Sequence, residues 1–255
     1  PGAMTKALVR RPSPDLANGL ISHIERRPPD VALATRQWDA YVNALASVGW
    51  QIVEVPAAPH HPDSVFIEDT VVSWRDLAVI TNPGAPERRG ETAGVELAVA
   101  ELGLELKHIE SPATLDGGDV LKIGNRMYVG VGGRTNPAAC EQLATLLPVD
   151  VVPVQVSKVL HLKSAVTALP DGTIIGHPPL VDDPDVFDTF LPVPEEAGSH
   201  VVVIDDETVL MAASAPRTQA LFEGRGLQVI AVDISEFEKL EGCVTCLSVR
   251  LRDLS

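Results

Sequence analysis

The chain has 255 residues, of which 45% are apolar and 22% charged, as in a soluble globular protein and unlike a disordered one. Its 35 acidic and 20 basic residues give a net charge of −15. That charge argues against nucleic acid or an anionic membrane as partner, and is compatible with a small cationic substrate. No apolar run is long enough to span a membrane, and no signal-peptide core follows the N-terminus.

Cysteine usage and the N-terminal residues add two expectations. Three cysteines in a chain of this length do not form a disulfide framework, so we expect a cytoplasmic protein. Pro1, Gly2 and Ala3 resemble the remnant of a cleaved tag ahead of Met4. We expect residues 1–255 to form a single domain, because no long linker or low-complexity segment divides them.

Apolar periodicity predicts helices along the chain. The spacing i, i+3, i+4, i+7 recurs over residues 38–45, 95–102 and 140–147. A fourth helix is expected from Pro216 to the stop at Gly224 and Gly226. A short fifth helix is expected to start at Ser235, where Ser-Glu-Phe-Glu has the pattern of a capping box.

Strand-like runs occur in pairs separated by turn residues. The pairs are 65–74 with 77–81, 120–123 with 127–131, 165–169 with 173–176, and 201–204 with 208–212. Single strands are expected at 105–109, 151–156 and 229–232. The chain therefore repeats a strand, strand, helix, strand unit at intervals of roughly forty to fifty residues.

The remaining segments complete five units. Residues 185–190 are expected to form the helix of the third unit. The fifth unit would need both ends of the chain, with strands at 246–251 and 7–10, a helix at 35–47 and a last strand at 51–55. Five ββαβ units closed in this way predict an α/β ring resembling a propeller, with a pseudo-fivefold axis.

Acidic residues cluster where the first two units begin. Asp63, Glu68 and Asp69 lie next to apolar strand residues, and burying them requires a cation or hydrogen-bond donors. A solvated strand end explains this segment equally well. In the second unit, Asp116 and Asp119 flank two glycines, which allow close approach of another backbone. An ordinary Asp-Gly turn is the simpler interpretation of that segment taken alone.

Histidine and cysteine occupy the equivalent places in the third and fifth units. His161 alone is weak evidence, because the chain has seven histidines. Cys243 and Cys246 form a C-x-x-C pair, but residues three apart on a strand face opposite sides, which disfavours shared ligation. Cys140 lies on an apolar helix stripe and is expected in the core. Together the units offer a thiolate nucleophile, a general acid/base and carboxylates.

Six segments carry a resemblance to a known family. They are residues 66–70, 82–89, 115–121, 134–136, 160–164 and 245–249. In order and spacing they resemble the dimethylarginine dimethylaminohydrolase family of the guanidino-group-modifying (pentein) superfamily, over about residues 7–251. The resemblance implies a five-bladed α/β-propeller. It also implies hydrolysis of asymmetric dimethylarginine and monomethylarginine to citrulline plus dimethylamine or methylamine.

The resemblance assigns catalytic roles to three residues. Cys246 is implied to be the nucleophile that forms a covalent thiouronium intermediate, and His161 the proton donor and later the base. Asp116 is implied to orient His161. No metal or organic cofactor is required, although zinc can inhibit members of the family by binding the thiolate, here Cys246.

The resemblance also implies the substrate contacts. The implied contacts are Asp69 with Glu68 at the guanidinium, Asp63 near the α-amino end, Arg88 and Arg134 at the α-carboxylate, the backbone of Leu16 in a mobile lid, and the carbonyl of Leu240 at the substrate amine. The expected partner is a small cationic methylated arginine, with no nucleic acid and no membrane. The oligomeric state, including a homodimer, is left open.

Three alternatives are considered. Arginine deiminase shares the fold and the Cys/His/acid set but carries a large helical insertion, for which 255 residues leave no room. A catalytically silent binding protein for arginine derivatives would have no need of Cys246, His161 and Asp116 together. A structural zinc site at Cys243 and Cys246 lacks two of the four expected ligands.

Overall fold

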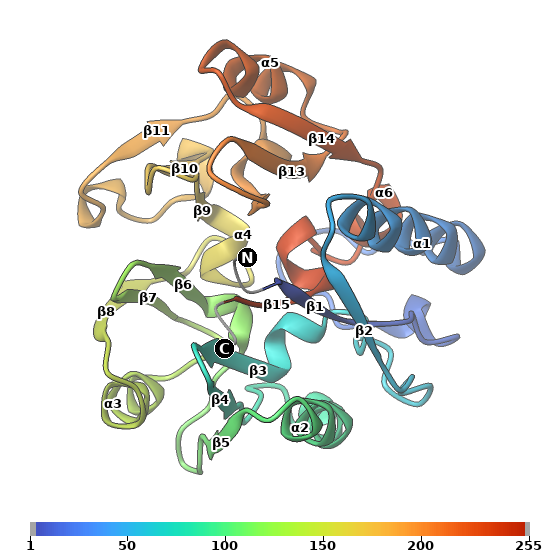
Figure 1. Cartoon of the computed structure of the whole chain (residues 1–255), viewed down its shortest axis with the longest axis vertical. Helices are drawn as coiled ribbons and strands as arrows, with labels where there is room; N and C mark the ends of the chain where they lie inside the picture. The colour runs from blue at the N-terminus through green and yellow to red at the C-terminus, as the bar shows by residue number, and fades with distance from the viewer. Residues whose placement is uncertain (1–3, 253–255) are drawn as a thin grey trace.

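The strands of the chain form five separate three-stranded sheets around a common centre (Figure 1). The computed structural model describes residues 4–252, so the tag remnant expected at residues 1–3 lies outside the described part. In each sheet the middle strand runs antiparallel to the inner strand and parallel to the outer strand.

The strands, given as inner, middle and outer in each sheet, are close to those expected. They are β15 (Val249–Leu251), β1 (Lys6–Arg10) and β2 (Gln51–Val55); β3 (Val71–Trp74), β4 (Leu77–Ile80) and β5 (Glu105–His108); β6 (Val120–Ile123), β7 (Arg126–Val131) and β8 (Asp150–Gln155); β9 (Val166–Ala168), β10 (Ile174–Gly176) and β11 (Phe190–Pro192); and β12 (Val201–Val203), β13 (Thr208–Ala212) and β14 (Gln228–Val232). The two ends of the chain meet in the first of these sheets, as expected.

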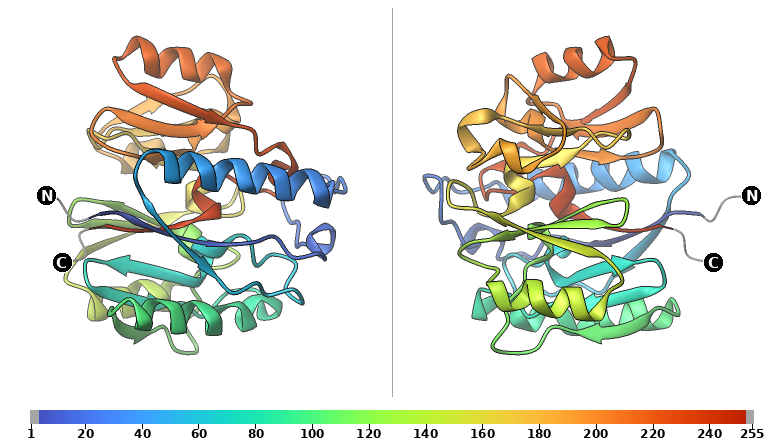
Figure 2. Two further views of the ribbon diagram at one scale, coloured as in Figure 1. Left: turned by 45° about the vertical axis from the view of Figure 1, so that its right-hand side comes forward. Right: turned by 90° about the vertical axis from the view of Figure 1, so that its left-hand side faces the viewer.

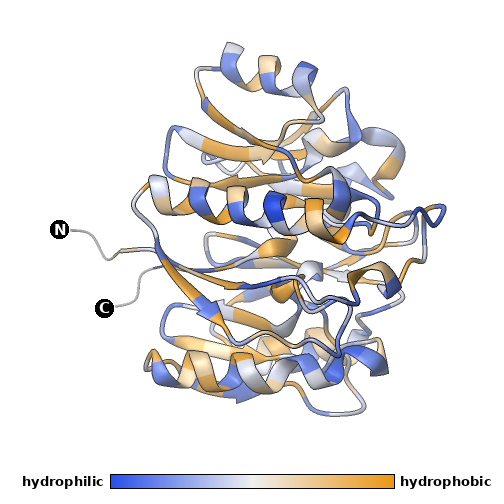
Figure 3. Ribbon diagram, turned by 90° about the vertical axis from the view of Figure 1, so that its right-hand side faces the viewer, coloured by the Kyte–Doolittle hydropathy of each residue, from blue (hydrophilic) through white to orange (hydrophobic). Residues whose placement is uncertain are grey.

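Four helices connect middle strands to outer strands and lie around the outside of the molecule (Figure 1). They are α1 (Val31–Ser47), α2 (Thr92–Glu101), α3 (Pro137–Leu146) and α5 (Pro216–Gly224). The first three were expected from apolar spacing, and the fourth from Pro216 at its start and the glycines at its end. Where residues are coloured by hydropathy, the strands are largely hydrophobic and the outer helices alternate between both colours (Figure 3). This alternation is the pattern of helices that bury one face.

The helix expected at 185–190 does not form, so that prediction is wrong. The segment between β10 and β11 contains only 3₁₀ turns, at Pro178–Leu180 and Pro184–Val186. Three prolines lie in this connection and each removes a backbone N–H. None of them lies within 185–190, however. Phe190 pairs with Ile174 as the first residue of β11, so the strand takes the end of the expected helix and leaves a short turn at Pro184–Val186.

The short helix α6 (Ser235–Glu238) forms where expected, but without its capping box. Its N-cap residue is Ile234. The hydroxyl of Ser235 instead accepts a hydrogen bond from Gln37 of α1 at 2.8 Å. A tertiary contact has therefore taken the side chain that the local pattern assigned to the cap.

A short helical turn comes directly before each inner strand. These turns are η2 (Ile67–Thr70), η4 (Gly117–Asp119), α4 (Leu162–Ala165), η7 (Glu196–Ser199) and η8 (Val244–Leu247). The strands expected to start at residues 65 and 246 therefore start later, at 71 and 249. Because the inner strands lie side by side around the centre, their preceding turns bring five distant parts of the sequence together.

The core is divided into clusters, several of which lie between neighbouring sheets. Leu8 of β1 is fully buried, and it belongs to one cluster with Ile67, Val249 and Leu251. This cluster connects the strands from both ends of the chain to the turn before the next sheet. Leu8 also pairs with Val249 across the antiparallel strands. Within residues 4–252, none of the helices combines the length and apolar character needed to cross a membrane.

Candidate active site

The turns before the inner strands meet at a small pocket. Its lining residues are Leu20, Asp63, Phe66, Asp69, Arg88, Arg134, Leu160, His161, Leu240, Glu241, Gly242 and Cys246. Seven of the ten residues singled out from the sequence are in this set, and Asp116 lies directly behind it. The pocket has a volume of about 20 Å³, which is room for one water, since roughly 10–15 Å³ suffices for that.

Asp116 and His161 form the tightest polar pair of the pocket. His161 Nε2 lies 2.8 Å from Asp116 Oδ2, and the Asp116 side chain is fully buried. Asp116 also accepts hydrogen bonds from the Gly84 N–H at 2.9 Å and from Arg134 at 3.2 Å. Burial disfavours the Asp116 carboxylate, but the hydrogen bond and charge of His161 outweigh it, so its pKa lies below the usual value.

His161 is charged in this environment. Burial disfavours the imidazolium, but the charges of Asp69 and Asp119 and the hydrogen bond to Asp116 raise the pKa of His161 to about 10. His161 is the residue before α4, and the next N–H, that of Leu162, donates to Asp119 at 2.9 Å. Asp119 therefore has two effects: it binds the first N–H of α4, and its charge raises the pKa of His161.

Asp69 is held between a backbone N–H and a buried arginine. Its Oδ1 accepts from Gly118 at 2.8 Å and its Oδ2 from Arg88 at 2.7 Å. Arg88 also donates to both oxygens of Glu91 at 2.9 Å and to the carbonyls of Asp63 and Phe66 at 3.2 Å. In this conformation Arg88 supports Asp69, and most of its N–H groups are occupied by the protein.

Two glycines permit this close arrangement. A Cβ at Gly118 would lie 2.8 Å from both Asp69 Oδ1 and His161 Nδ1. A Cβ at Gly84 would lie 2.2 Å from the Arg134 carbonyl oxygen. The Asp-Gly-Gly-Asp segment is thus more than an ordinary turn, because two acidic residues and the imidazole pack against it.

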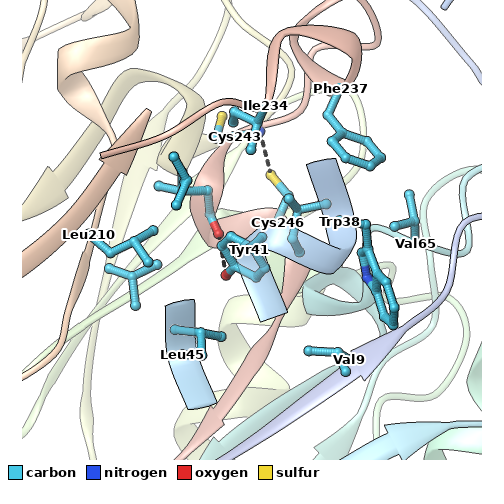
Figure 4. Packing of buried hydrophobic residues seen from close by; sticks show 14 of the residues in the cluster. Val9, Trp38, Tyr41, Leu45, Val65, Leu210, Ile234, Phe237, Cys243 and Cys246 are labelled. Carbon is cyan, nitrogen blue, oxygen red and sulfur yellow. Dashed lines mark hydrogen bonds between the residues drawn. The ribbon is translucent and has the colours of Figure 1, made fainter. Parts of the chain in front are cut away.

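Cys246 lies at the edge of a buried apolar cluster, beside Cys243. Its Sγ accepts a hydrogen bond from the Cys243 N–H at 3.4 Å (Figure 4). The side chain of Cys243 lowers the pKa of the Cys246 thiol, and the Cys243 N–H adds a smaller effect in the same direction, against burial and the charges of Glu68 and Asp69. The pKa of the Cys243 thiol is raised well above the usual value by the same pairing and by burial. Of the two thiols, Cys246 is therefore the one that ionises.

The expected geometry of the C-x-x-C pair is corrected by the structure. Both cysteines precede β15, in and beside the turn η8, so the argument from opposite faces of a strand does not apply. In the described part of the chain, the group of potential metal ligands that lies close together is Asp69, Asp116 and His161, with no cysteine. Arg88 and Arg134 donate to those two carboxylates, so cations of the protein already occupy this position.

A segment before α1 covers the pocket. The Leu20 N–H donates to both oxygens of Asp63, at 3.2 and 3.1 Å. The N–H groups of Ser22 and His23 donate to Glu241 at 3.2 and 2.6 Å. Leu16 lies in a 3₁₀ turn, with its side chain in the core, so Leu20 and not Leu16 lines the pocket.

Glu68 faces away from this pocket. Its Oε2 accepts hydrogen bonds from Lys163 and Arg250, both at 2.8 Å, and its buried Oε1 has no partner among the described residues. Glu68 lines a different, larger cavity on the other side of the turns. Its neighbour Asp69 is the carboxylate beside His161, with 3.8 Å between Oδ1 and Nε2.

Sequence reasoning gave no role to several residues of this network. Glu91, Lys163 and Arg250 form ion pairs with residues that it did single out, and Glu241 binds the N–H groups of the covering segment. Lys163 lies beside His161 and could have been considered for that reason. The other three lie outside any acidic or basic pattern in the sequence, and only the fold brings them to their partners.

Comparisons with known proteins agree with this geometry. A family model described as arginine deiminase matches residues 58–197. A Streptomyces coelicolor protein named N(G),N(G)-dimethylarginine dimethylaminohydrolase is 62% identical over 252 residues, covering 98% of each chain. A Pseudomonas aeruginosa protein of the same name is 35% identical, covering 95% of this chain and 98% of its own.

Solved structures show the same fold. A cysteine-to-serine variant of the Pseudomonas aeruginosa dimethylarginine dimethylaminohydrolase, complexed with citrulline, matches with a TM-score of 0.90 and 33% identity. The match covers 98% of this chain and all of that one. A histidine-to-glycine variant of a dimethylarginine dimethylaminohydrolase, solved as an adduct with S-methyl-L-thiocitrulline, matches equally well. The chain therefore belongs to the dimethylarginine dimethylaminohydrolase family, hydrolases of the pentein superfamily that act on amidine C–N bonds.

Proposed function

We propose that this chain hydrolyses asymmetric dimethylarginine and monomethylarginine to citrulline plus dimethylamine or methylamine. The observation that carries the proposal is one pocket holding a thiol of lowered pKa, a charged histidine paired with a buried carboxylate, and a second carboxylate. A thiol nucleophile, an acid and a group that holds a cation are the parts this reaction needs. The relative with 62% identity carries the corresponding name.

In the proposed mechanism, Asp69 holds the guanidinium and the Cys246 thiolate attacks its central carbon. His161, protonated at neutral pH because its pKa is about 10, gives its proton to the departing amine as the C–N bond breaks. A thiouronium remains covalently bound to Cys246. His161, now neutral, takes a proton from water, the resulting hydroxide attacks the same carbon, and the C–S bond breaks to release citrulline.

The remaining residues are proposed to place the two ends of the substrate. Asp63 is assigned to the α-amino end and Arg134, with Arg88, to the α-carboxylate. The backbones of Leu16 and Leu240 are assigned to the lid and to the substrate amine, and Glu68 to the guanidinium end, next to Asp69 in the turn η2. Since the pocket holds only about 20 Å³, far below the size of an arginine derivative, binding requires the covering segment to move.

We propose further that the five sheets form a closed five-bladed α/β-propeller, which is supported by the pairing of β1 with β15. In this proposal the whole chain is one catalytic domain. The reaction needs no metal or organic cofactor, and zinc would act only as an inhibitor at the Cys246 thiolate.

The proposal is tested by incubating the purified chain with asymmetric dimethylarginine, monomethylarginine, symmetric dimethylarginine and arginine. We expect citrulline with dimethylamine or methylamine from the first two, and little product from the others. A Cys246→Ser variant controls for background hydrolysis. Release of ammonia from arginine at a higher rate than amine from either asymmetric substrate would contradict the proposal.

That contrary outcome would support an arginine deiminase activity. The match of residues 58–197 to the arginine deiminase model is the observation in its favour. Both activities would use the same thiol, histidine and carboxylates, so substitution of those residues does not separate them. The identity of the released amine does.

A further inference from the structure

A second cavity, with a volume of about 750 Å³, lies at the centre of the molecule. Residues of the inner strands of all five sheets line it, and it shares no lining residue with the pocket of Cys246. The inner strands end towards the face where β1 begins and β15 ends, opposite the segment that covers the pocket (Figure 2). The turns η2, α4 and η8 separate the two spaces.

The charge of this cavity is opposite to that of the whole chain. Among the described residues that line it, one is acidic, Glu68, and five are basic: Arg75, Lys122, Lys163, Arg250 and Arg252. Glu68 is already paired with two of the five, Lys163 and Arg250. Arg252 also stacks on Trp50, outside the cavity, and is left out of the sum. The lining then has a surplus of three positive charges in a chain whose net charge is −15.

Lys122 lies at the centre of this surplus. Its ammonium group donates to the carbonyl and the hydroxyl of Ser73 at 2.9 and 3.2 Å, and both acceptors are neutral. Surrounding protein and the charges of Lys163, Arg250 and Arg252 lower the pKa of Lys122 below its usual value, although its side chain is exposed. The cavity thus brings like charges together, and within residues 4–252 the ammonium group of Lys122 binds only neutral oxygens.

We propose that the central cavity binds a small polyphosphate-class anion, held by Lys122 together with the arginines and Lys163. Guanidinium and ammonium groups are the side chains that bind phosphate oxygens. A triphosphate carries a negative charge close to the surplus of the lining. The volume lies within the range of roughly 300–1,000 Å³ typical of small-molecule sites, so a nucleoside attached to the phosphates would also fit.

The experiment is calorimetric titration of the full chain at low ionic strength with inorganic tripolyphosphate and, separately, with ATP. We expect one site per chain. Lys122→Gln, which keeps donors for Ser73, should weaken binding at least about tenfold, and Lys122→Arg by less than about threefold. Lys107→Gln makes the same charge change on the surface beside Glu105 and should leave the affinity unchanged.

Proton uptake gives a second readout. An anion favours the charged form of Lys122, so binding near pH 7 should take up protons and strengthen as the pH falls from 8 to 6. Titrations in buffers of different ionisation enthalpy measure that uptake, and Lys122→Gln should reduce it. If Lys122→Gln does not fold, Arg75→Gln at the β3–β4 turn replaces it in the affinity comparison.

Each remaining outcome decides the question. Tighter binding of ATP than of tripolyphosphate would identify a nucleotide, and the reverse an inorganic polyphosphate. The proposal is overturned if neither probe binds, or if Lys107→Gln weakens binding as much as Lys122→Gln does. In that case the basic lining acts only as a counter-charge for Glu68.

Discussion

At the scale of single residues, the two neighbouring cysteines differ because their side chains interact, which raises the pKa of Cys243 and lowers that of Cys246. Cys246 Sγ accepts the N–H of Cys243, which favours its thiolate, whereas the Cys243 thiol is kept protonated. Tyr41 next to them is neutral as well, because burial raises the pKa of its hydroxyl to about 12. The pocket therefore presents one nucleophile.

The first prediction separates the two cysteines by substitution. Cys246→Ser should reduce citrulline formation to near the uncatalysed background, because a hydroxyl is a far weaker nucleophile at neutral pH. Cys243→Ser keeps the backbone N–H that Cys246 accepts and should retain measurable turnover. Circular dichroism and Tm serve to check folding of both variants. Inactivity of Cys243→Ser together with an active Cys246→Ser would reverse the assignment.

The second prediction concerns His161. Removal of a general acid/base commonly costs about 10²–10⁴-fold in rate, so His161→Gly should lower kcat by that much while changing substrate affinity far less. Presteady-state and equilibrium binding measurements separate these effects. An undiminished kcat would show that His161 has no role in proton transfer.

The same residue predicts a pH dependence of stability. The pKa of His161 is raised to about 10 in the folded chain from an ordinary 6.5, so its charge stabilises the fold fully below about pH 6.5. That contribution declines as the pH rises through 10. The free energy of unfolding from urea titrations at pH 7 and pH 10 should fall more for the wild type than for His161→Gln. Equal declines in the two chains would contradict the raised pKa.

At the scale of elements, the short turns before the inner strands determine where each reactive group lies. The turn η2 carries Glu68 and Asp69 on neighbouring positions, and it directs one to the central cavity and the other to the pocket. Asp63 and Glu241, which lie outside these turns, hold the covering segment by accepting hydrogen bonds from its backbone N–H groups. Glu241 has a backbone φ of 62° and an almost fully buried side chain.

The third prediction tests Glu241 as the residue that holds the covering segment. Glu241→Ala removes the acceptor of the Ser22 and His23 N–H groups, so amide hydrogen exchange at these residues should accelerate about tenfold or more. Glu238→Ala, which removes a hydrogen bond to Ser214 instead, is the matched control. Unchanged exchange at Ser22 and His23 in Glu241→Ala would show that other contacts hold the segment.

At the scale of the whole molecule, the first and last strands of the sequence, β1 and β15, pair in one sheet. Leu8 in β1 packs against β15 and against η2, so its side chain connects three parts of the chain. The contacts across this sheet are of long sequence separation. Loss of one of them should therefore lower the stability of the whole fold rather than loosen one end.

The fourth prediction measures that effect. Leu8→Ala should lower the free energy of unfolding by about 2–5 kcal/mol, the usual cost of a leucine truncated in a core. Leu97→Ala, at a helix position that is 68% exposed, should change it by less than about 0.5 kcal/mol. Denaturant titrations of both variants provide the comparison. A Leu8→Ala chain as stable as Leu97→Ala would mean that the ends of the chain are not held together.

The sequence by itself determined the repeating unit, most strand and helix positions, and the pocket residues Cys246, His161 and Asp69. These features depend on local spacing of apolar residues and on segments that resemble one family, and both can be seen along the chain. Two local predictions fail because tertiary contacts override them: Phe190 pairs with Ile174 in β11, and Ser235 binds Gln37 in place of capping α6. Only the tertiary structure decided that Glu68 faces the central cavity and that Arg88 supports Asp69. The physical reason is that partners of such buried charges lie far apart along the chain: Glu68 binds Lys163 and Arg250 from other units, and no local pattern records that separation.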